Sequence, residues 1–288
     1  MKEKVVVITG SNSGIGRITA TEIAKMGAQV VMVCRNEQKA KAVQDDINAL
    51  TGLNNCDLFL CDFSSHQSIK KFAKEIRTRY NHIDVLINNA GVVLGKRELT
   101  EDGFEKMFAT NHLGYFLVTH YLLDLLKASE SGRIVNVSSV AHRFTGMNWD
   151  NLHAEKRFNM WIQYGHTKLM TILFNKELAY QLKKNTNITA NCLHPGNVNT
   201  NIGSNGNKLM RFLTSNFGFV LTSPEKGAET SIYLATSPLV HHKTGLYWYR
   251  KNPTIPSLEA ISSENARKLW EISLQLTGIK EFGVVDFD

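Results

Sequence analysis

The segment Thr9-Gly-Ser-Asn-Ser-Gly-Ile-Gly16 constrains the fold more than any other stretch of the chain. An apolar β-branched run at 5–9 precedes it and a helical pattern over 15–26 follows it. Glycine at positions 10, 14 and 16 lets the backbone turn tightly and approach a pyrophosphate held at the helix N-terminus. A plain strand-to-helix turn would not need three glycines. The segment therefore predicts a dinucleotide site in a βαβ unit.

The same alternation of apolar runs and helical patterns continues along the chain and predicts parallel βαβ units. No linker or internal repeat divides it. We expect one α/β domain over 1–288: a Rossmann-type doubly wound parallel sheet of about seven strands in three α/β/α layers. Ser64 with Gln67 suggests a capping box, and Ser223-Pro224 a helix start. The expected strands are 5–9, 30–34, 57–60, 85–88, 134–138, 189–193 and 246–248, and the expected helices are 15–26, 37–48, 64–80, 103–126, 161–182, 224–235 and 263–276.

Composition excludes several other classes of protein. No run approaches the length of a bilayer span, and Met1-Lys-Glu-Lys leads directly into a strand, so we expect no signal peptide or anchor and a cytoplasmic location. The net charge of +7 is spread in ones and twos, which predicts a solvated surface and no nucleic-acid partner. The four cysteines lack metal-ligand spacing, so we expect free thiols and no metal site.

The end of the second expected strand bears on cofactor choice. A site that prefers NAD places an acid there for the ribose hydroxyls, whereas an arginine suits the 2′-phosphate of NADP. The acid position holds Cys34, and Arg35 follows it. We expect NADPH/NADP rather than NADH, with an ordinary surface arginine as the alternative interpretation.

Polar residues follow the next strands. Asp62 is expected to accept from the adenine amine, with a backbone N–H from Phe63 beside it, and small residues in Asn88-Asn-Ala-Gly91 would let a cofactor cross the strand ends. Asn111 lies in an apolar helix, and because a buried amide needs partners, a kink or an ordered water is expected there. Asn136-Val-Ser-Ser139 places hydroxyls at the same sheet edge. Each of these, taken alone, is equally compatible with an ordinary strand end or helix residue.

Tyr164 and Lys168 are one helical turn apart. A cation at this spacing would stabilise the phenolate and lower the tyrosine pKa, as a general acid or base requires. Tyr-x-x-x-Lys is common by chance, so its weight depends on the nucleotide site and the hydroxyls described above.

Together these motifs resemble the short-chain dehydrogenase/reductase superfamily, and within it the retinol dehydrogenase branch. The superfamily motifs are Thr9-Gly-x-x-x-Gly-Ile-Gly16, Asp62, Asn88-Asn-Ala-Gly91, Asn111, Ser139, Tyr164-x-x-x-Lys168 and Pro195-Gly196 with Thr200. The branch motifs are Cys34-Arg-Asn36, Asn136-Val-Ser-Ser-Val-Ala-His142, His194-Pro-Gly196, the insert 143–160, and the late patterns at 223–228 and 267–270.

The resemblance implies roles for four residues. Tyr164 is the general acid in carbonyl reduction, and Lys168 binds the nicotinamide ribose and lowers the tyrosine pKa. Ser139 holds the substrate oxygen; Ser138 points to the opposite face because strand side chains alternate. Asn111 holds a water that links Lys168 to solvent.

The cofactor-binding residues that we expect combine the motifs above with those that the resemblance adds. They are Gly10, Ser11, Asn12, Ser13, Gly14, Ile15, Gly16, Arg35, Asp62, Phe63, Asn89, Ala90, Gly91, Tyr164, Lys168, Pro195, Gly196, Val198 and Thr200. The chain departs from the family inside the tyrosine motif, where His166 and Thr167 replace the usual serine-containing pair. A core or solvent-facing histidine is the simpler interpretation of His166.

Substrate choice in this fold lies after Thr200. The segment 201–222 is apolar and aromatic, and we expect a lid over a lipophilic substrate, with contact to a membrane surface; a core-packing helix is the alternative. Trp149, Phe158 and Trp161 would form the opposite wall.

The sequence thus predicts an NADPH-preferring oxidoreductase that interconverts a lipophilic aldehyde or ketone and its alcohol, with retinal, fatty aldehyde or steroid-type substrates. A catalytically silent NADP-binding sensor or scaffold is the alternative, and a sugar-nucleotide epimerase or dehydratase is a weaker rival. A homodimer through the helices at 103–126 and 161–182 follows only from the family analogy.

Overall fold

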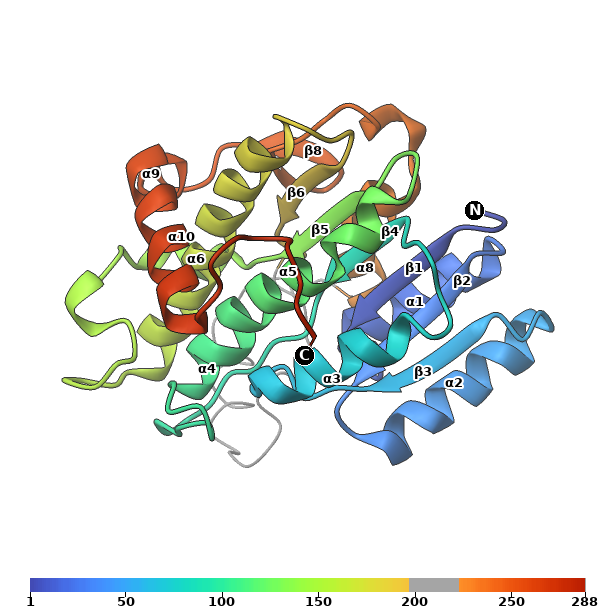
Figure 1. The fold of residues 1–288 in the computed structure, drawn as a ribbon, viewed down its shortest axis with the longest axis horizontal. Helices are drawn as coiled ribbons and strands as arrows, with labels where there is room; N and C mark the ends of the chain where they lie inside the picture. The colour runs from blue at the N-terminus through green and yellow to red at the C-terminus, as the bar shows by residue number, and fades with distance from the viewer. Residues whose placement is uncertain (197–222, 288) are drawn as a thin grey trace.

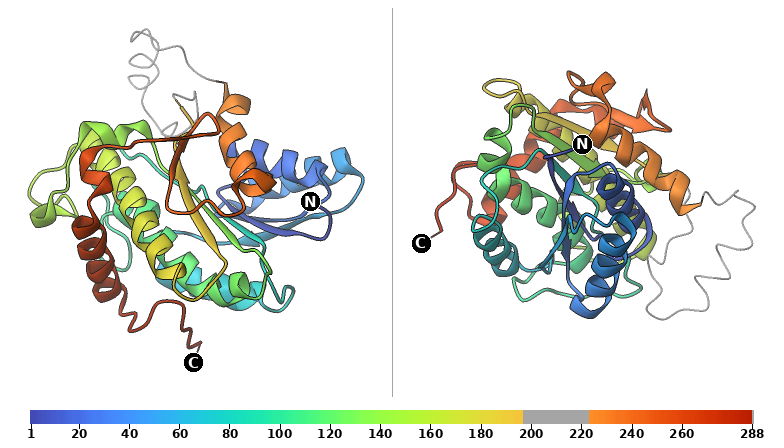
Figure 2. Two further views of the ribbon diagram at one scale, coloured as in Figure 1. Left: turned by 90° about the horizontal axis from the view of Figure 1, so that it is seen from above. Right: turned by 90° about the vertical axis from the view of Figure 1, so that its right-hand side faces the viewer.

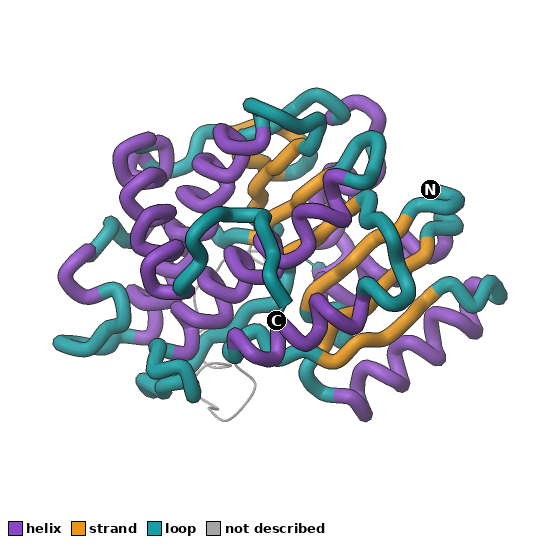
Figure 3. Tube along the Cα trace, viewed as in Figure 1, coloured by secondary structure: helices purple, strands orange, loops and turns teal. Residues whose placement is uncertain are grey.

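In the computed structural model, which describes residues 1–196 and 223–287, the centre of the molecule is one twisted sheet (Figures 1 and 3). The strand order is β3-β2-β1-β4-β5-β6-β7-β8, and every neighbouring pair is parallel except β7 and β8. The predicted doubly wound α/β fold is confirmed, with one strand more than expected. The strands are β1 (Val5–Thr9), β2 (Gln29–Cys34), β3 (Cys56–Leu60), β4 (Val85–Asn88), β5 (Arg133–Val137), β6 (Thr189–Leu193), β7 (Tyr247–Tyr249) and β8 (Asn252–Thr254).

Helices cover both faces of the sheet, which is why its central strands are apolar along their whole length (Figure 2). Strand alternation divides the core: Val6 and Ile8 of β1 face α1, α2 and α8, whereas Val5 and Val7 face α3, α5 and α6. The longer helices are α1 (Gly14–Lys25), α2 (Glu37–Thr51), α3 (His66–Ile76), α5 (Gly114–Lys127), α6 (Met160–Leu182), α8 (Pro224–Thr236) and α10 (Ser263–Thr277).

The helix predicted over 103–126 is interrupted. A short α4 (Lys106–Phe108) leads into a π-helical turn, η1 (Ala109–Leu113), and then into α5. The buried carboxylate of Glu105 caps this start, because it accepts from Met107 N and Phe108 N at 2.9 Å each. The irregularity expected near Asn111 is therefore a π-helical turn.

The start of α3 corrects the predicted capping box. Ser65, not Ser64, is the N-cap, and its hydroxyl accepts from Ser68 N at 3.2 Å. Ser64 instead donates to Asp62 Oδ1 at 2.6 Å. The other predicted start is confirmed, since the Ser223 side chain caps α8 with Pro224 in its first turn.

The C-terminal segment wraps the side of the molecule formed by α5 and α6. The α10 helix packs on α6, and the chain beyond it crosses α5 (Figure 1). Phe282 anchors this tail, with its ring 4.9 Å from that of Phe116 and 4.5 Å from that of Trp270. Gly283 N then donates to His120 Nδ1 at 2.9 Å.

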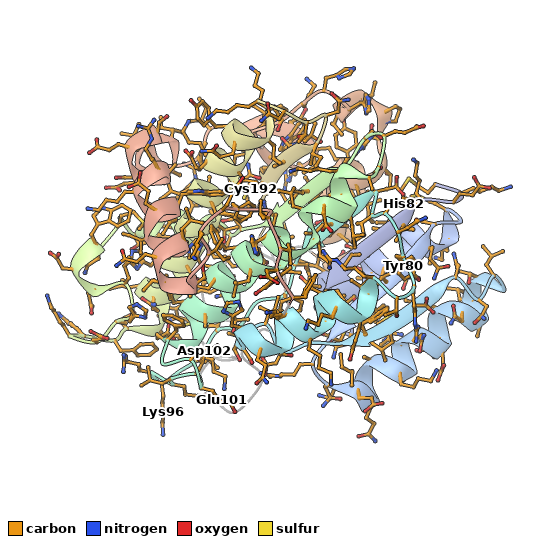
Figure 4. The ribbon with its side chains drawn as sticks, in the orientation of Figure 1. Tyr80, His82, Lys96, Glu101, Asp102 and Cys192 are labelled. Atoms are coloured by element: carbon orange, nitrogen blue, oxygen red, sulfur yellow. The ribbon has the colours of Figure 1, made fainter. Side chains whose placement is uncertain are left out.

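All four cysteines are buried as free thiols. Figure 4 places Cys192 among the side chains in the middle of the molecule, and Lys96, Glu101 and Asp102 at an edge. Burial raises the pKa of the Cys192 thiol to about 12, so this cysteine is protonated and unreactive at neutral pH.

Phe282→Ala should lower the free energy of unfolding by about 2 kcal/mol, because it removes the aromatic contacts that hold the tail on α5 and α10. Val284→Ala is the matched control, since Val284 is 60% exposed on the same tail. Urea unfolding measures both variants. Equal stabilities for the two would show that the tail contributes nothing to the fold.

Candidate active site

The predicted site residues gather at the carboxyl ends of β1, β4, β5 and β6. The strand order reverses between β1 and β4, where an open α/β sheet leaves a crevice for ligands. The Thr9 hydroxyl ties the two strand ends together, because it accepts from Asn89 N and Ala90 N at 2.9 Å each. Two cofactor segments predicted separately therefore form one hydrogen-bonded unit.

The glycine-rich turn needs its glycines for close packing. Gly10 has φ +66°, and a Cβ there would lie 2.8 Å from Ala90 Cα. A Cβ on Gly16 would lie 2.4 Å from Gly10 O and 2.5 Å from Asn89 Nδ2. The Asn89 amide donates to Thr9 O at 2.9 Å, so this side chain supports the turn from within.

The turn leaves the N-terminus of α1 available to an anion. Ser13 is the N-cap but its side chain makes no capping hydrogen bond, and the first turn carries no acidic residue. By contrast, side chains cap α2, α3, α6, α8 and α10. Backbone N–H groups without a side-chain acceptor, at the positive end of a helix dipole, fit a dinucleotide pyrophosphate.

Ser11 contributes only its backbone to such a site. Its hydroxyl is buried, donates to Ile8 O at 3.0 Å and lies 3.5 Å from Cys34 Sγ. Asn12 and Ser13 retain solvent exposure, whereas Ile15 is buried.

Arg35 and Asp62 lie beside each other after β2 and β3. The Arg35 side chain is 57% exposed, and its Nη1 is 3.5 Å from Asp62 Oδ2. Burial raises the pKa of Asp62, but hydrogen bonds from Ser64 and the charge of Arg35 outweigh it, so the pKa is lowered overall. Asp62 is therefore an ionised acceptor. Phe63 is buried in the core.

Lys168 is buried on α6 with its amine directed at the end of β5. Nζ donates to Val137 O at 2.9 Å and lies 5.8 Å from the centre of the Tyr164 ring. Burial lowers the pKa of Lys168 to about 8. Gly91 lies beside this amine, since a Cβ there would be 3.5 Å from Nζ, at ordinary van der Waals distance.

Tyr164 differs from expectation in the direction of its pKa. Burial raises the pKa of this phenol, and the hydrogen bond with the Ser139 hydroxyl opposes the rise. The predicted lowering by Lys168 is wrong for the chain by itself, because burial is the largest effect. Tyr164 is protonated at neutral pH, as a proton donor must be.

The two serines after β5 have different surroundings. The Ser138 hydroxyl is buried and donates to Lys168 O at 2.7 Å. The Ser139 hydroxyl accepts from Ala141 N at 3.2 Å and faces Tyr164. Because the Ser139 hydroxyl accepts from Ala141 N, its proton stays free to donate. This supports the prediction that Ser139, and not Ser138, binds the substrate oxygen.

Asn111 has protein partners on both sides of its buried amide. Oδ1 accepts from Val92 N at 2.8 Å, and Nδ2 donates to Val92 O at 3.0 Å and to Thr167 Oγ1 at 3.1 Å. The Thr171 hydroxyl donates to Asn111 O at 3.3 Å. Thr167 is a site residue that sequence reasoning missed; its position inside the Tyr-x-x-x-Lys motif was the available signal.

His166 is a core histidine, as the simpler interpretation predicted. It is 2% exposed and its Nε2 accepts from Asn148 N at 3.0 Å. Burial lowers its pKa to about 4, so it is neutral at physiological pH.

The remaining predicted residues are only partly placed. Pro195 and Gly196 follow β6, and Gly196 N donates to His194 Nδ1 at 3.2 Å. Val198, Thr200 and the predicted lid at 201–222 lie outside the described residues. Trp149 packs under the amine of Lys268, 4.5 Å away, and Trp161 is 49% exposed. The predicted substrate wall stays a prediction.

Residues 1–196 and 223–287 show neither a metal site nor a membrane-spanning helix. No group of three or more His, Cys, Asp or Glu side chains is arranged to hold a metal ion. None of the helices in this part of the chain is long and apolar enough to cross a membrane.

Comparison with known proteins agrees with this geometry. The family model for short chain dehydrogenases matches residues 4–210. Retinol dehydrogenase 11 of Homo sapiens is 40% identical over 276 residues, covering 96% of this chain and 86% of that protein. Retinol dehydrogenase 14 of Mus musculus is 41% identical over 295 residues, covering 97% and 87%. A crystal structure of an uncharacterised protein from Mycobacterium paratuberculosis aligns with a TM-score of 0.80 at 31% identity, covering 98% of this chain and 96% of that one.

Lys168→Met tests the burial of the amine. Lys168 keeps its proton to higher pH in the unfolded state than in the folded state, where its pKa is about 8. The free energy of unfolding of wild type therefore rises with pH between the folded and the unfolded pKa of this lysine. The stability of the methionine variant relative to wild type should therefore fall by about 3 kcal/mol from about pH 7 to about pH 10. Thermal and urea unfolding at several pH values measure it.

Lys176→Met changes a partly exposed lysine on the same helix and is the control. Its free energy of unfolding should differ from that of wild type by the same amount at every pH. If the stability difference between Lys168→Met and wild type is also independent of pH, the Lys168 amine is not desolvated as the structure indicates.

Proposed function

We propose that this chain, which belongs to the short-chain dehydrogenase family and is retinol dehydrogenase-like, is an NADPH-preferring enzyme that interconverts a lipophilic aldehyde or ketone and its alcohol. Family membership makes it an NAD(P)-dependent oxidoreductase acting on CH–OH groups. The observation that carries the proposal is the convergence of Ser139, Tyr164 and Lys168 at the end of β5, beside the glycine-rich turn.

The cofactor would lie across the carboxyl ends of β1, β4 and β5. Bound NADPH supplies the hydride for carbonyl reduction. The N-terminus of α1 would take the pyrophosphate, and the ionised Asp62 would accept from the adenine amine. Lys168, whose amine now donates to Val137 O, would bind the nicotinamide ribose. The remaining proposed contacts are those of Phe63, Asn89, Ala90, Gly91, Tyr164, Pro195, Gly196, Val198 and Thr200.

The chain's own groups supply the proton and hold the substrate oxygen. The Ser139 hydroxyl, which accepts from Ala141 N, would donate a hydrogen bond to the carbonyl oxygen and keep its own proton. The Tyr164 phenol, protonated at neutral pH, transfers its proton to the same oxygen as negative charge develops there. Lys168, with its pKa of about 8, would supply the proton that restores the Tyr164 phenol. Asn111, fixed by Val92 and Thr167, would hold the water that connects Lys168 to solvent.

The preference for NADPH rests on Arg35. Cys34 occupies the position of the ribose-binding acid and is 1% exposed, so no carboxylate faces the 2′ position from β2. Arg35 is exposed, and only a long contact of 3.5 Å joins it to Asp62. Its guanidinium is thus free to turn to a 2′-phosphate, which it can bind with two parallel N–H groups.

The relatives support the proposed substrate class. They are retinol dehydrogenases, so retinal-like carbonyl compounds are the first substrates to test, followed by fatty-aldehyde and steroid-type compounds. The test measures the decrease in reduced-nicotinamide absorbance with carbonyl compounds of increasing chain length. NADPH and NADH are assayed in parallel. Turnover that rises with substrate apolarity supports the proposal. NADPH binding without any turnover favours the silent sensor or scaffold.

The predicted homodimer interface on α5 and α6 is covered by other parts of the same chain. The faces of these helices that lie away from the sheet carry α10 and the C-terminal tail, with Phe116 of α5 packed against Trp270 and Phe282. A dimer of that kind would have to displace both segments. Peripheral contact with a membrane remains part of the proposal for the lid segment.

Tyr164→Phe should reduce turnover to below about 1% of wild type, because it removes the proton donor while keeping the ring. NADPH affinity should change by less than about twofold, since the ring and Lys168 remain. Tyr180→Phe, an exposed tyrosine on the same helix, is the control and should match wild type. Near-normal turnover of the Tyr164 variant would identify another proton donor.

Arg35→Asp should weaken NADPH binding by roughly 100-fold and leave NADH binding within a fewfold of wild type, because the new carboxylate repels the 2′-phosphate. Lys41→Asp makes the same charge change on the exposed face of α2, where Lys41 pairs with Asp45 at 2.9 Å. Fluorescence titration with both nucleotides measures the affinities. Equal losses of NADPH and NADH for Arg35→Asp would contradict the 2′-phosphate assignment.

A further inference from the structure

His142 connects the proposed substrate-binding serine to the C-terminal part of the chain. It is fully buried in the short 3-10 helix η2 (Val140–Phe144), three residues after Ser139. Its Nδ1 lies 2.6 Å from Ser139 O, and its Nε2 lies 3.2 Å from Ser257 N. Ser257 immediately precedes α9 (Leu258–Ile261), more than a hundred residues further along the chain.

The two partners fix the tautomer of this imidazole. A backbone N–H only donates, so Nε2 must accept from Ser257 and carries no proton. A backbone carbonyl only accepts, so Nδ1 must carry the proton and donate it to Ser139 O. The neutral Nδ1–H form alone satisfies both contacts. The Tyr247 hydroxyl, 3.4 Å from Nδ1, is a longer and secondary contact.

We propose that His142 is a positioning residue that aims the Ser139 hydroxyl at the substrate oxygen, and that Ser257 N–H selects the tautomer that does so. The inference rests on the role of Ser139 in the proposed function. Under this proposal, the orientation of the Ser139 hydroxyl depends on a residue of the C-terminal segment that lies outside the proposed cofactor and substrate contacts.

The backbone of Ser139 is held from several directions. Its carbonyl receives both His142 N at 3.2 Å and His142 Nδ1 at 2.6 Å. On the preceding residue, Ser138 N donates to Leu193 O at 2.7 Å. With these contacts Ser139 keeps an extended conformation, φ −149° and ψ 154°, from which its hydroxyl meets both Ala141 N and Tyr164. Loss of the Nδ1–H bond leaves the Ser139 carbonyl with only the longer contact from His142 N.

The C-terminal segment is fixed to η2 by more than this histidine. Arg143 Nη2 donates to Ile255 O, and Met147 N lies 3.4 Å from Glu259 Oε2. These contacts flank Ser257 on both sides in the sequence. They keep Ser257 N in place opposite the imidazole, so the segment that selects the tautomer is itself held in position.

Ser257→Pro removes the selecting N–H and places the ring Cδ where the hydrogen was, against His142 Nε2, so it both deletes the donor and pushes on the imidazole. The backbone of Ser257 accepts the proline ring, because its φ of −66° is the value that the ring imposes. Its own hydroxyl makes no hydrogen bond within the described part of the chain. Ser257→Ala therefore keeps the N–H and is the matched control.

We expect Ser257→Pro to lower kcat by about 10- to 100-fold with KM for NADPH unchanged, and Ser257→Ala to match wild type. His142→Asn, whose amide can replace the Nδ1–H donor, should retain more activity than His142→Ala. In a Ser139→Ala background the proline should have no further effect, because the hydroxyl that it misdirects is absent. An equal loss in that background would show a general structural effect and overturn the proposal.

A readout independent of activity separates this inference from the proposed function. Nitrogen-15 NMR of the imidazole distinguishes Nδ1–H from Nε2–H. The Nδ1–H tautomer should be present in wild type and Ser257→Ala and lost or mixed in Ser257→Pro. If wild type turns over no carbonyl substrate but shows this pattern, the proposed function fails and the tautomer selection stands. An Nε2–H ring in wild type overturns the inference, whatever the activity.

Discussion

The hydrogen bonds of the Thr9 hydroxyl to Asn89 N and Ala90 N are the constraint on which the site depends. They join the ends of β1 and β4 at the place where the strand order reverses, so the glycine-rich turn and the Asn-Ala-Gly segment cannot separate. Gly10 and Gly16 pack against the same segment with no room for a side chain. These contacts fix the turn that presents the N-terminus of α1, whose backbone N–H groups have no side-chain cap and can receive an anion.

Around that crevice, polar groups are buried at a cost to stability and are satisfied by one another. Lys168 is buried and its pKa falls, which is unfavourable at neutral pH, yet its amine and its carbonyl are bound by Val137 and Ser138. Asn111 occupies a π-helical turn and joins β4 to α6 through Val92 and Thr167. Irregular helical turns of this kind are frequent at functional sites.

The C-terminal part of the chain completes the molecule in two ways. The α10 helix and the tail cover α5 and α6, where Phe282 and Trp270 add an aromatic contact to the core. The segment before α9 contacts η2, where Ser257 N donates to His142 Nε2. One stretch of chain therefore stabilises the helices that carry the site and also contacts the strand end that presents Ser139.

The choice of Ser139 over Ser138 remains a prediction from strand alternation. The sequence alone predicted the α/β alternation, the glycine-rich turn and an irregularity near Asn111, because these depend on periodicity, on turn chemistry and on an amide that must be satisfied locally. It did not determine the cap at Ser65, the strand β8, the raised pKa of Tyr164 or the tautomer of His142. The cap was ambiguous between adjacent serines. The others depend on burial and on partners distant in sequence: Tyr164 is desolvated by packed elements, and His142 is fixed by Ser257. Only the tertiary structure brings those groups together, and so only it decides their protonation.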